Sequence, residues 1–172
     1  VCVCVCVCVC VCVCVCVCVF TAMQHGRTAL WIAASLGHKE VVEKLAQQAR
    51  EGKCSLDSED KCARTPLWIA VSNGHKDVAQ LLMQHSRYSR HTTSEMINKK
   101  DKDENSPLKV ACLKGNLPLV QLLCEWGADL HCKDKDGLPP LVLATKLGYH
   151  GVAEYLKKQL LEWQQRETQK VG

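Results

Sequence analysis

Apolar residues recur at helical spacing in four stretches of the chain, and each stretch is typical of a helix with one buried face. The recurring positions are Val41, Val42 and Leu45; Val78, Leu81 and Leu82; Leu119, Val120, Leu122 and Leu123; and Val152, Tyr155 and Leu156. A shorter apolar run precedes each stretch, so the pattern predicts four pairs of short helices. Because such short helices are marginally stable alone, we expect neighbouring pairs to stack around a shared core.

The four pairs are also copies of one another. The copies are GRTALWIAASLGHKEVVEKL from Gly26, ARTPLWIAVSNGHKDVAQLL from Ala63, ENSPLKVACLKGNLPLVQLL from Glu104 and GLPPLVLATKLGYHGVAEYL from Gly137. The first three copies carry a residue type that caps helix N-termini, namely Thr28, Thr65 and Ser106. Each copy has a glycine where its first helix should end, at Gly37, Gly74, Gly115 and Gly148.

These copies resemble the ankyrin repeat, in which a β-turn finger precedes each pair of helices. The segment GADLHCKDKDG, Gly127 to Gly137, follows the finger of that family nearly letter for letter, and NKKDKD at 98–103 matches the same finger. The resemblance runs from Met23 to about Leu160. It implies an all-α fold, an ankyrin-repeat solenoid of about four helix-turn-helix units with β-turn fingers.

This resemblance divides the chain into three parts. We expect a low-complexity tract at 1–21, an ankyrin repeat domain at 22–160, and a polar helical extension or cap at 161–172. The four repeats are expected at about 23–52, 60–90, 101–130 and 134–160.

The chain departs from the ankyrin pattern in two ways that bear on packing. The histidine that follows T-P-L in the family is replaced by Trp31, Trp68, Lys109 and Val142. We expect this change to remove a side-chain hydrogen bond between neighbouring repeats. The connections before the second and third repeats are longer than in the family, and we expect both to be solvated and mobile.

Residues 1–19 alternate strictly between Val and Cys and contain nine of the 14 cysteines. The tract has the hydropathy of a minimal membrane span, the alternation of a strand and the thiol density of a soft-metal site. However, the dinucleotide repeat GTGTGT encodes Val-Cys, and codons for Phe20-Thr21-Ala22 can contain TTTACAG, the form of a splice acceptor. We therefore interpret residues 1–21 as translated intron or microsatellite sequence.

The 153 residues that follow the Val-Cys alternation of 1–19 have the composition of one globular domain with five scattered cysteines. The formal net charge of +4 is mixed along the chain, so we expect no nucleic-acid or membrane surface. A membrane-anchored protein would depend wholly on the Val-Cys tract.

Candidate chemistry is sparse. Cys112 occupies a small-residue position of a first helix, so we interpret it as a buried hydrophobe rather than a nucleophile. Neither Cys54 with Cys62 nor Cys124 with His131 and Cys132 has the spacing of a zinc site. Gly-rich phosphate loops are absent from the sequence. We expect no catalytic residue, no metal and no cofactor.

The resemblance implies a non-catalytic scaffold or adaptor that binds an unidentified protein partner on its concave face. We expect a monomer in the cytoplasm, with the nucleus as an alternative compartment. A second interpretation is that the chain is the ankyrin segment of a larger enzyme or channel, such as a kinase, a ubiquitin ligase or an ion channel.

Positions that flank the finger and end the first helix commonly contact partners in the ankyrin family. By alignment they are Gln24, His25, Arg27, Ser35 and Leu36; Lys61, Cys62, Arg64, Ser72 and Asn73; Lys102, Asp103, Asn105, Leu113 and Lys114; and Lys135, Asp136, Leu138, Lys146 and Leu147. Among them we expect the apolar Leu36, Leu113 and Leu147 to be energetic anchors of the interface.

The interpretation of the Val-Cys tract makes a direct prediction about the transcript. Mature transcripts should lack codons for residues 1–21, which sequencing of cDNA across this junction would show. An in-frame cDNA that retains the repeat would contradict the intron interpretation, and carbonate extraction of the protein would then test membrane attachment.

Overall fold

The computed structural model describes residues 24–51, 55–86 and 92–171. The Val-Cys tract, Ala22, Met23 and Cys54 therefore lie outside the described residues. A short turn, η1 (Gln24–Gly26), leads into the first pair, α2 (Ala29–Leu36) and α3 (Lys39–Arg50). The later pairs are α4 (Pro66–Ser72) with α5 (Lys76–Ser86), α7 (Pro107–Leu113) with α8 (Leu117–Glu125), and α9 (Pro140–Lys146) with α10 (His150–Val171).

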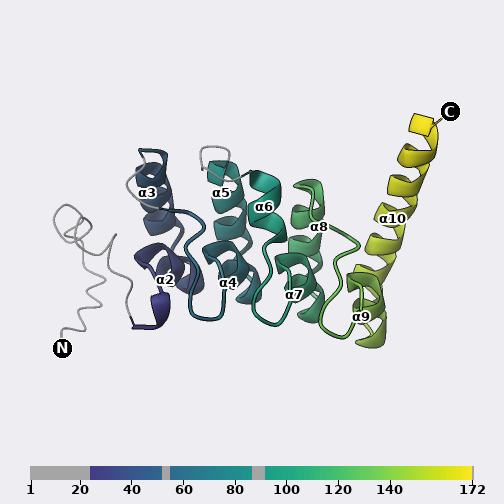
Figure 1. Cartoon of the computed structure of the whole chain (residues 1–172), viewed down its shortest axis with the longest axis horizontal. Helices are drawn as coiled ribbons and strands as arrows, with labels where there is room; N and C mark the ends of the chain where they lie inside the picture. Colours follow the sequence, from purple (N-terminus) through teal and green to yellow (C-terminus); the bar gives the residue numbers. More distant parts are fainter. Residues whose placement is uncertain (1–23, 52–54, 87–91, 172) are drawn as a thin grey trace.

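The helix pairs stack side by side into an array, which confirms the predicted all-α solenoid. Figure 1 shows the first helices α2, α4, α7 and α9 in one row and the second helices α3, α5, α8 and α10 in another. The end of α10 extends beyond its neighbours (Figure 1). Within the described ranges, no helix combines the length and the apolar character needed to cross a membrane.

The start of each first helix follows the capping pattern seen in the sequence. The side-chain oxygens of Thr28, Thr65 and Ser106 each accept a hydrogen bond from the backbone N–H three residues later, at 3.1 to 3.3 Å. Pro139 makes no such side-chain cap for α9. The helices α2, α4 and α7 therefore each have one N-terminal backbone N–H group bonded to a side-chain cap, whereas α9 has no such bond.

The glycines between the helices are required by conformation and, at two positions, also by space. Gly37 and Gly115 have φ of 76° and 66°. A Cβ atom on Gly37 would lie 2.7 Å from the His75 ring, and one on Gly115 would lie 2.6 Å from the Tyr149 ring. Each glycine thus lets a side chain of the next repeat approach the turn closely.

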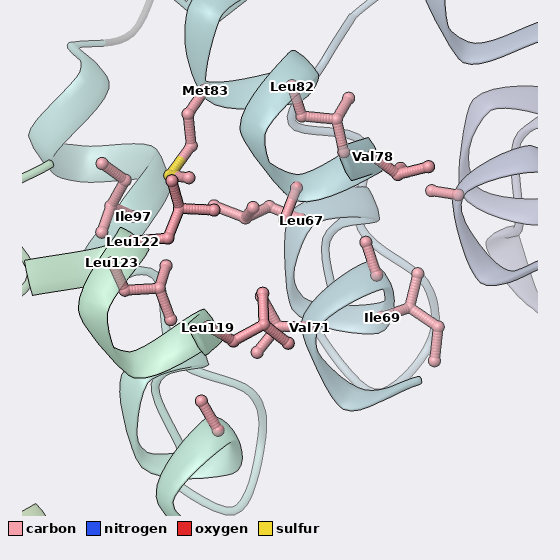
Figure 2. Close-up of a cluster of buried hydrophobic side chains, with 14 of the residues drawn as sticks. Leu67, Ile69, Val71, Val78, Leu82, Met83, Ile97, Leu119, Leu122 and Leu123 are labelled. Atoms are coloured by element: carbon pink, nitrogen blue, oxygen red, sulfur yellow. The ribbon is translucent and has the colours of Figure 1, made fainter. Parts of the chain in front are cut away.

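The core runs through the whole array, between the rows of helices and between neighbouring pairs. Between neighbouring repeats, α4 packs against α7 and α5 packs against α8. Figure 2 shows Val71 of α4 and Leu119 of α8 within one buried cluster. Burying a leucine or valine contributes about 2 kcal/mol of hydrophobic stabilisation. Stacking therefore supplies the core that a single pair lacks.

One residue of the predicted apolar faces is not part of this core. Val41 is 47% exposed, whereas Val78, Leu119 and Val152, at the same position of the later repeats, are all buried. Val41 therefore stays exposed within the described part of the chain, although its place in the repeat is that of buried residues. The prediction of a buried Val41 was therefore wrong.

The long connection before the third repeat is not fully solvated, contrary to expectation. It forms an extra helix, α6 (Thr93–Asn98), with Thr92 as its N-cap. The Thr92 hydroxyl accepts a hydrogen bond from the Glu95 amide, and the Glu95 carboxylate accepts one from the Thr92 amide. Met96 and Ile97 are buried, and Ile97 lies close to Leu122 and Leu123 (Figure 2).

The connection before the second repeat likewise buries Leu56. Both insertions therefore add apolar side chains to the core, and the expectation of solvated connections is wrong for these residues.

Three of the four substitutions at the family's histidine position keep a polar contact with the next repeat. The indole N–H of Trp31 donates to the Arg64 carbonyl at 3.1 Å, and that of Trp68 donates to the Asn105 carbonyl at 3.1 Å. In the third repeat, the Lys109 ammonium forms an ion pair with Asp134. The expected loss of an inter-repeat hydrogen bond was therefore wrong for these three repeats, because an indole or an ammonium can also reach the next finger.

The Lys109–Asp134 pair predicts a large cost on removal of its cation. The two side chains are only 4% and 7% exposed, so Lys109→Ala would leave the Asp134 carboxylate buried without its cation. We expect the free energy of unfolding to fall by about 3 kcal/mol, measured by urea denaturation followed by circular dichroism.

Lys135→Ala is the matched control, because Lys135 pairs with Asp103 between the same two repeats. Both of these side chains are more than half exposed, so we expect the urea midpoint to stay unchanged. Equal effects of the two substitutions would contradict a role for burial.

Candidate partner-binding surface

The 20 residues predicted to contact a partner, which we call the display surface, lie on the fingers and at the ends of the first helices. The side chain of Gln24 lies outside the described residues, and none of the other 19 is buried. Six are half-buried, namely Arg27, Ser35, Arg64, Ser72, Asn105 and Leu138. The exposed ones are His25, Leu36, Lys61, Cys62, Asn73, Lys102, Asp103, Leu113, Lys114, Lys135, Asp136, Lys146 and Leu147.

Backbone hydrogen bonds join the first three fingers to one another. The Lys61 amide donates to the His25 carbonyl at 3.0 Å, and the Lys102 amide donates to the Cys62 carbonyl at 3.1 Å. Each bond links residues of the display surface in neighbouring repeats. The exposed side chains at the fingers are therefore carried by a backbone held in register.

The second and third fingers are each folded around a carboxylate. Asp60 accepts hydrogen bonds from the Cys62 and Arg64 amides, at 2.9 and 3.0 Å. Asp101 does the same for the Asp103 and Asn105 amides, at 2.9 and 2.8 Å. Because these carboxylates satisfy the backbone N–H groups of the turn, they fix its shape.

The ends of the first helices meet at a second set of contacts. The Asn73 side-chain amide donates to the Ser35 carbonyl at 2.8 Å, and a His75 ring nitrogen lies 3.1 Å from the same oxygen. These contacts join the first repeat to the second. The structure thus brings display-surface residues of neighbouring repeats together in pairs, along an elongated surface.

Arginine and tryptophan side chains alternate between the first two repeats. The Arg27 guanidinium lies 4.7 Å from the centre of the Trp31 ring, within the range of a cation–π contact. The Arg64 guanidinium lies 5.8 Å from the Trp31 ring and 5.7 Å from the Trp68 ring. Sequence reasoning missed this ladder, although R-T-A-L-W and R-T-P-L-W place the same pair of residues in both repeats.

Arg64 is held further by the Asp60 carboxylate, at 2.9 and 2.6 Å from two guanidinium nitrogens. Burial raises the pKa of Asp60, but the hydrogen bonds from Arg64 and Cys62 outweigh it, so the pKa lies below its usual value. The side-chain hydrogen bond between Arg64 and Asp60 also raises the pKa of Arg64 above its usual value. Both groups are therefore charged at neutral pH, and the arginine is held in place between two aromatic rings.

Comparison with known families identifies the fold. A family model described as ankyrin repeats (3 copies) matches residues 8–93 and 90–166. The chain belongs to the ankyrin repeat family. Its fingers and helix pairs are those of ankyrin repeats.

Two curated relatives match one stretch of this ankyrin chain. They are Protein phosphatase 1 regulatory subunit 27 of Mus musculus and of Homo sapiens, each 47% identical over 49 residues. That stretch is 28% of this chain and 32% of each relative. The alignment thus spans about a third of the length of the curated relatives.

Three cysteines of the third and fourth repeats, Cys112, Cys124 and Cys132, are poor nucleophiles. Burial raises the pKa of the Cys112 thiol to about 12 and that of Cys124 to about 12. Burial also raises the pKa of Cys132, whose sulfur lies 3.2 Å from the Ser106 hydroxyl. At neutral pH these groups are thiols rather than the reactive thiolates.

Cys54 lies outside the described residues, and His131 and Cys132 are engaged in other contacts. The His131 ring packs edge-on against Trp163, with ring centres 5.0 Å apart, and Cys132 is buried beside Ser106. Among the described residues, no three metal-binding side chains are grouped closely enough to hold an ion.

Thiol reactivity tests the burial of Cys112. At pH 8 we expect iodoacetamide to alkylate the exposed Cys62 at least about 100 times faster than Cys112, whose pKa leaves about one thiol in 10,000 ionised. Peptide mapping by mass spectrometry at short reaction times measures both rates. In urea the two cysteines should react at similar rates, and similar rates in the folded chain would contradict the burial of Cys112.

Proposed function

We propose that this ankyrin array is a non-catalytic protein-binding module that holds its partner along the display surface. Ankyrin repeats generally mediate protein–protein interactions, which gives the class of function. The choice of surface is supported by its exposure together with its backbone order. Its described side chains are exposed or half-buried, while hydrogen bonds between the fingers hold the backbone beneath them.

Exposed leucines carry the proposal. Leu36, Leu113 and Leu147 are 54%, 38% and 47% exposed, although each stands at or beside the end of a first helix whose other face is packed. Leucine gains stabilisation when it is removed from water, and interfaces draw most of their energy from a few such anchors. A partner that covers these positions would bury apolar area that the isolated chain leaves in solvent.

The absence of catalysis is part of the proposal. The thiols of Cys112 and Cys124 are too weakly acidic to act as nucleophiles at neutral pH, which favours a binding role. If the chain is the ankyrin segment of a larger enzyme or channel, the display surface keeps the same role within it. We propose that the array works as a monomer in the cytoplasm or the nucleus.

The names of the curated relatives suggest the first partner to test. They are called regulatory subunits of protein phosphatase 1, so the catalytic subunit of that phosphatase is a direct candidate. Proteins retained from a cell lysate by the immobilised chain provide further candidates.

The test compares two double variants for binding to each partner found. Leu113→Asp with Lys114→Glu should weaken binding at least tenfold, about 1.4 kcal/mol, as measured by calorimetry. The melting temperature should barely change, because both side chains are exposed.

Lys157→Glu with Gln164→Asp is the matched control on the exposed side of α10. It changes the net charge by the same amount and should leave affinity unchanged. Binding that survives the first double variant but is lost in the second would place the interface on the outer helices and contradict the proposal.

A further inference from the structure

We propose that the display surface recognises an acidic segment of its partner, in which bulky apolar side chains are flanked by carboxylates. This inference rests on the proposed function and adds the chemistry of the partner. It is carried by the charge of the surface, by the pairing of its carboxylates and by the placement of its leucines.

The display surface is strongly basic, whereas the outer helices are nearly balanced. The surface has two acidic residues and seven basic ones, namely Arg27, Lys61, Arg64, Lys102, Lys114, Lys135 and Lys146. The four second helices, α3, α5, α8 and α10, together hold eight basic and seven acidic residues. The fingers also hold acidic residues outside this set, namely Glu59, Asp60, Asp101, Glu104, Asp129 and Asp134, so the positive excess belongs to the 20 positions of the display surface rather than to the fingers as a whole.

Apart from the exposed Asp136, most carboxylates on or near this surface are engaged by other groups. Five carboxylates of the fingers form ion pairs, in the pairs Asp60–Arg64, Glu59–Lys99, Glu104–Lys100, Asp103–Lys135 and Asp134–Lys109. Asp101 is buried and accepts hydrogen bonds from its own finger. These acids therefore do little to neutralise the remaining cations of the display surface.

Four lysines of the surface remain available to a partner. Lys61, Lys102, Lys114 and Lys146 are exposed, and none forms an ion pair with a residue that the structure describes. The half-buried Arg27 guanidinium rests on the Trp31 ring. Held by the ring, this arginine loses little side-chain entropy when it binds a carboxylate.

Cations and leucines are adjacent in the third and fourth repeats. Leu113 precedes Lys114 at the end of α7, and Lys146 precedes Leu147 at the end of α9. The helices α7 and α9 are neighbours in their row (Figure 1). In a partner segment with an apolar residue between two carboxylates, the apolar side chain would therefore cover a leucine while a carboxylate pairs with the adjacent lysine.

An acidic protein segment fits this surface better than a nucleic acid. A phosphate backbone needs a continuous run of cations. Here the basic positions are interrupted by the exposed Leu36, Leu113 and Leu147 and by Asp136, and a phosphate backbone would leave the leucines in water. An acidic segment with apolar side chains satisfies both kinds of position.

The probe is a random dodecamer peptide library displayed on phage and selected on the whole chain, kept reduced, at physiological salt. We expect enriched peptides to be rich in Asp and Glu and to contain Leu, Ile, Met or Phe. The most enriched peptide is then labelled with fluorescein, and its dissociation constant is measured by anisotropy. We expect that constant to rise as salt is increased, because the lysines are exposed.

Two variants of the surface and one matched control locate the binding. Lys114→Glu with Lys146→Glu should weaken the peptide at least tenfold, and Leu113→Ser with Leu147→Ser should weaken it by a similar factor. Lys157→Glu with Lys158→Glu makes the same change in net charge on α10 and should change affinity less than twofold. The control separates recognition by this surface from attraction by the overall charge of the chain.

The outcomes distinguish failure of this inference from failure of the proposed function. Neutral or basic peptides that bind through the display surface would overturn the acidic chemistry and leave the proposed function intact. Peptides whose affinity is unchanged by both surface variants would overturn this inference and the proposed function together. A random single-stranded DNA 20-mer that displaces the peptide at equal concentration would also overturn the inference, and so would a selection that enriches no sequence.

Discussion

The structure depends on one constraint, which is that each helix pair is too small to bury its own apolar surface. The first helices α4 and α7 have seven residues each, well below the length at which an isolated helix is stable in water. Buried alanines at one position of every repeat, Ala33, Ala70, Ala111 and Ala144, leave room for the helices to approach closely. Stability is therefore a property of the stack, and the order of each finger depends on the neighbours that pack beside it.

Hydrogen bonds and ion pairs between neighbouring repeats also order the display surface. At one position of the repeat, Trp31, Trp68 and Lys109 use two different chemistries to reach the next finger. Between fingers, backbone hydrogen bonds fix the register of the exposed positions. The side chains proposed to read a partner are thus presented by a preorganised backbone, which lowers the entropy cost of binding.

Local sequence was sufficient to predict the repeat, the caps and the turns. Thr28 and Thr65 cap their helices within three residues, and Gly37 ends its helix in the left-handed conformation, so these roles could be recognised from spacing alone. Val41 shows where this reasoning fails, because helical spacing does not say which apolar positions of a helix meet a neighbouring repeat. Helix α6 was missed because Met96 and Ile97 have no counterpart in the other repeats.

The candidate surface was predictable in position but not in its contacts. Alignment with the ankyrin pattern placed Leu113 and Lys114 at the end of a first helix, and the structure has them there, exposed. The interaction of Arg64 with two tryptophans was missed because it depends on side chains from two repeats. The hydrogen bonds at the family's histidine position were missed because tryptophan and lysine, which differ in size and charge, both supply a donor there. A polar contact with the next repeat is therefore present at this position, although the replacement of histidine suggested that it was lost.

The central claim, that the fingers form one ordered surface, is tested most directly by hydrogen exchange at two amides. The amides of Lys61 and Lys102 donate across repeats although their side chains are exposed. We expect both amides to exchange at least about 100 times more slowly than in an unstructured peptide, and to lose protection together with the helices as urea is added. Exchange of both amides at the unstructured rate, while the helix amides stay protected, would contradict a display surface held in register.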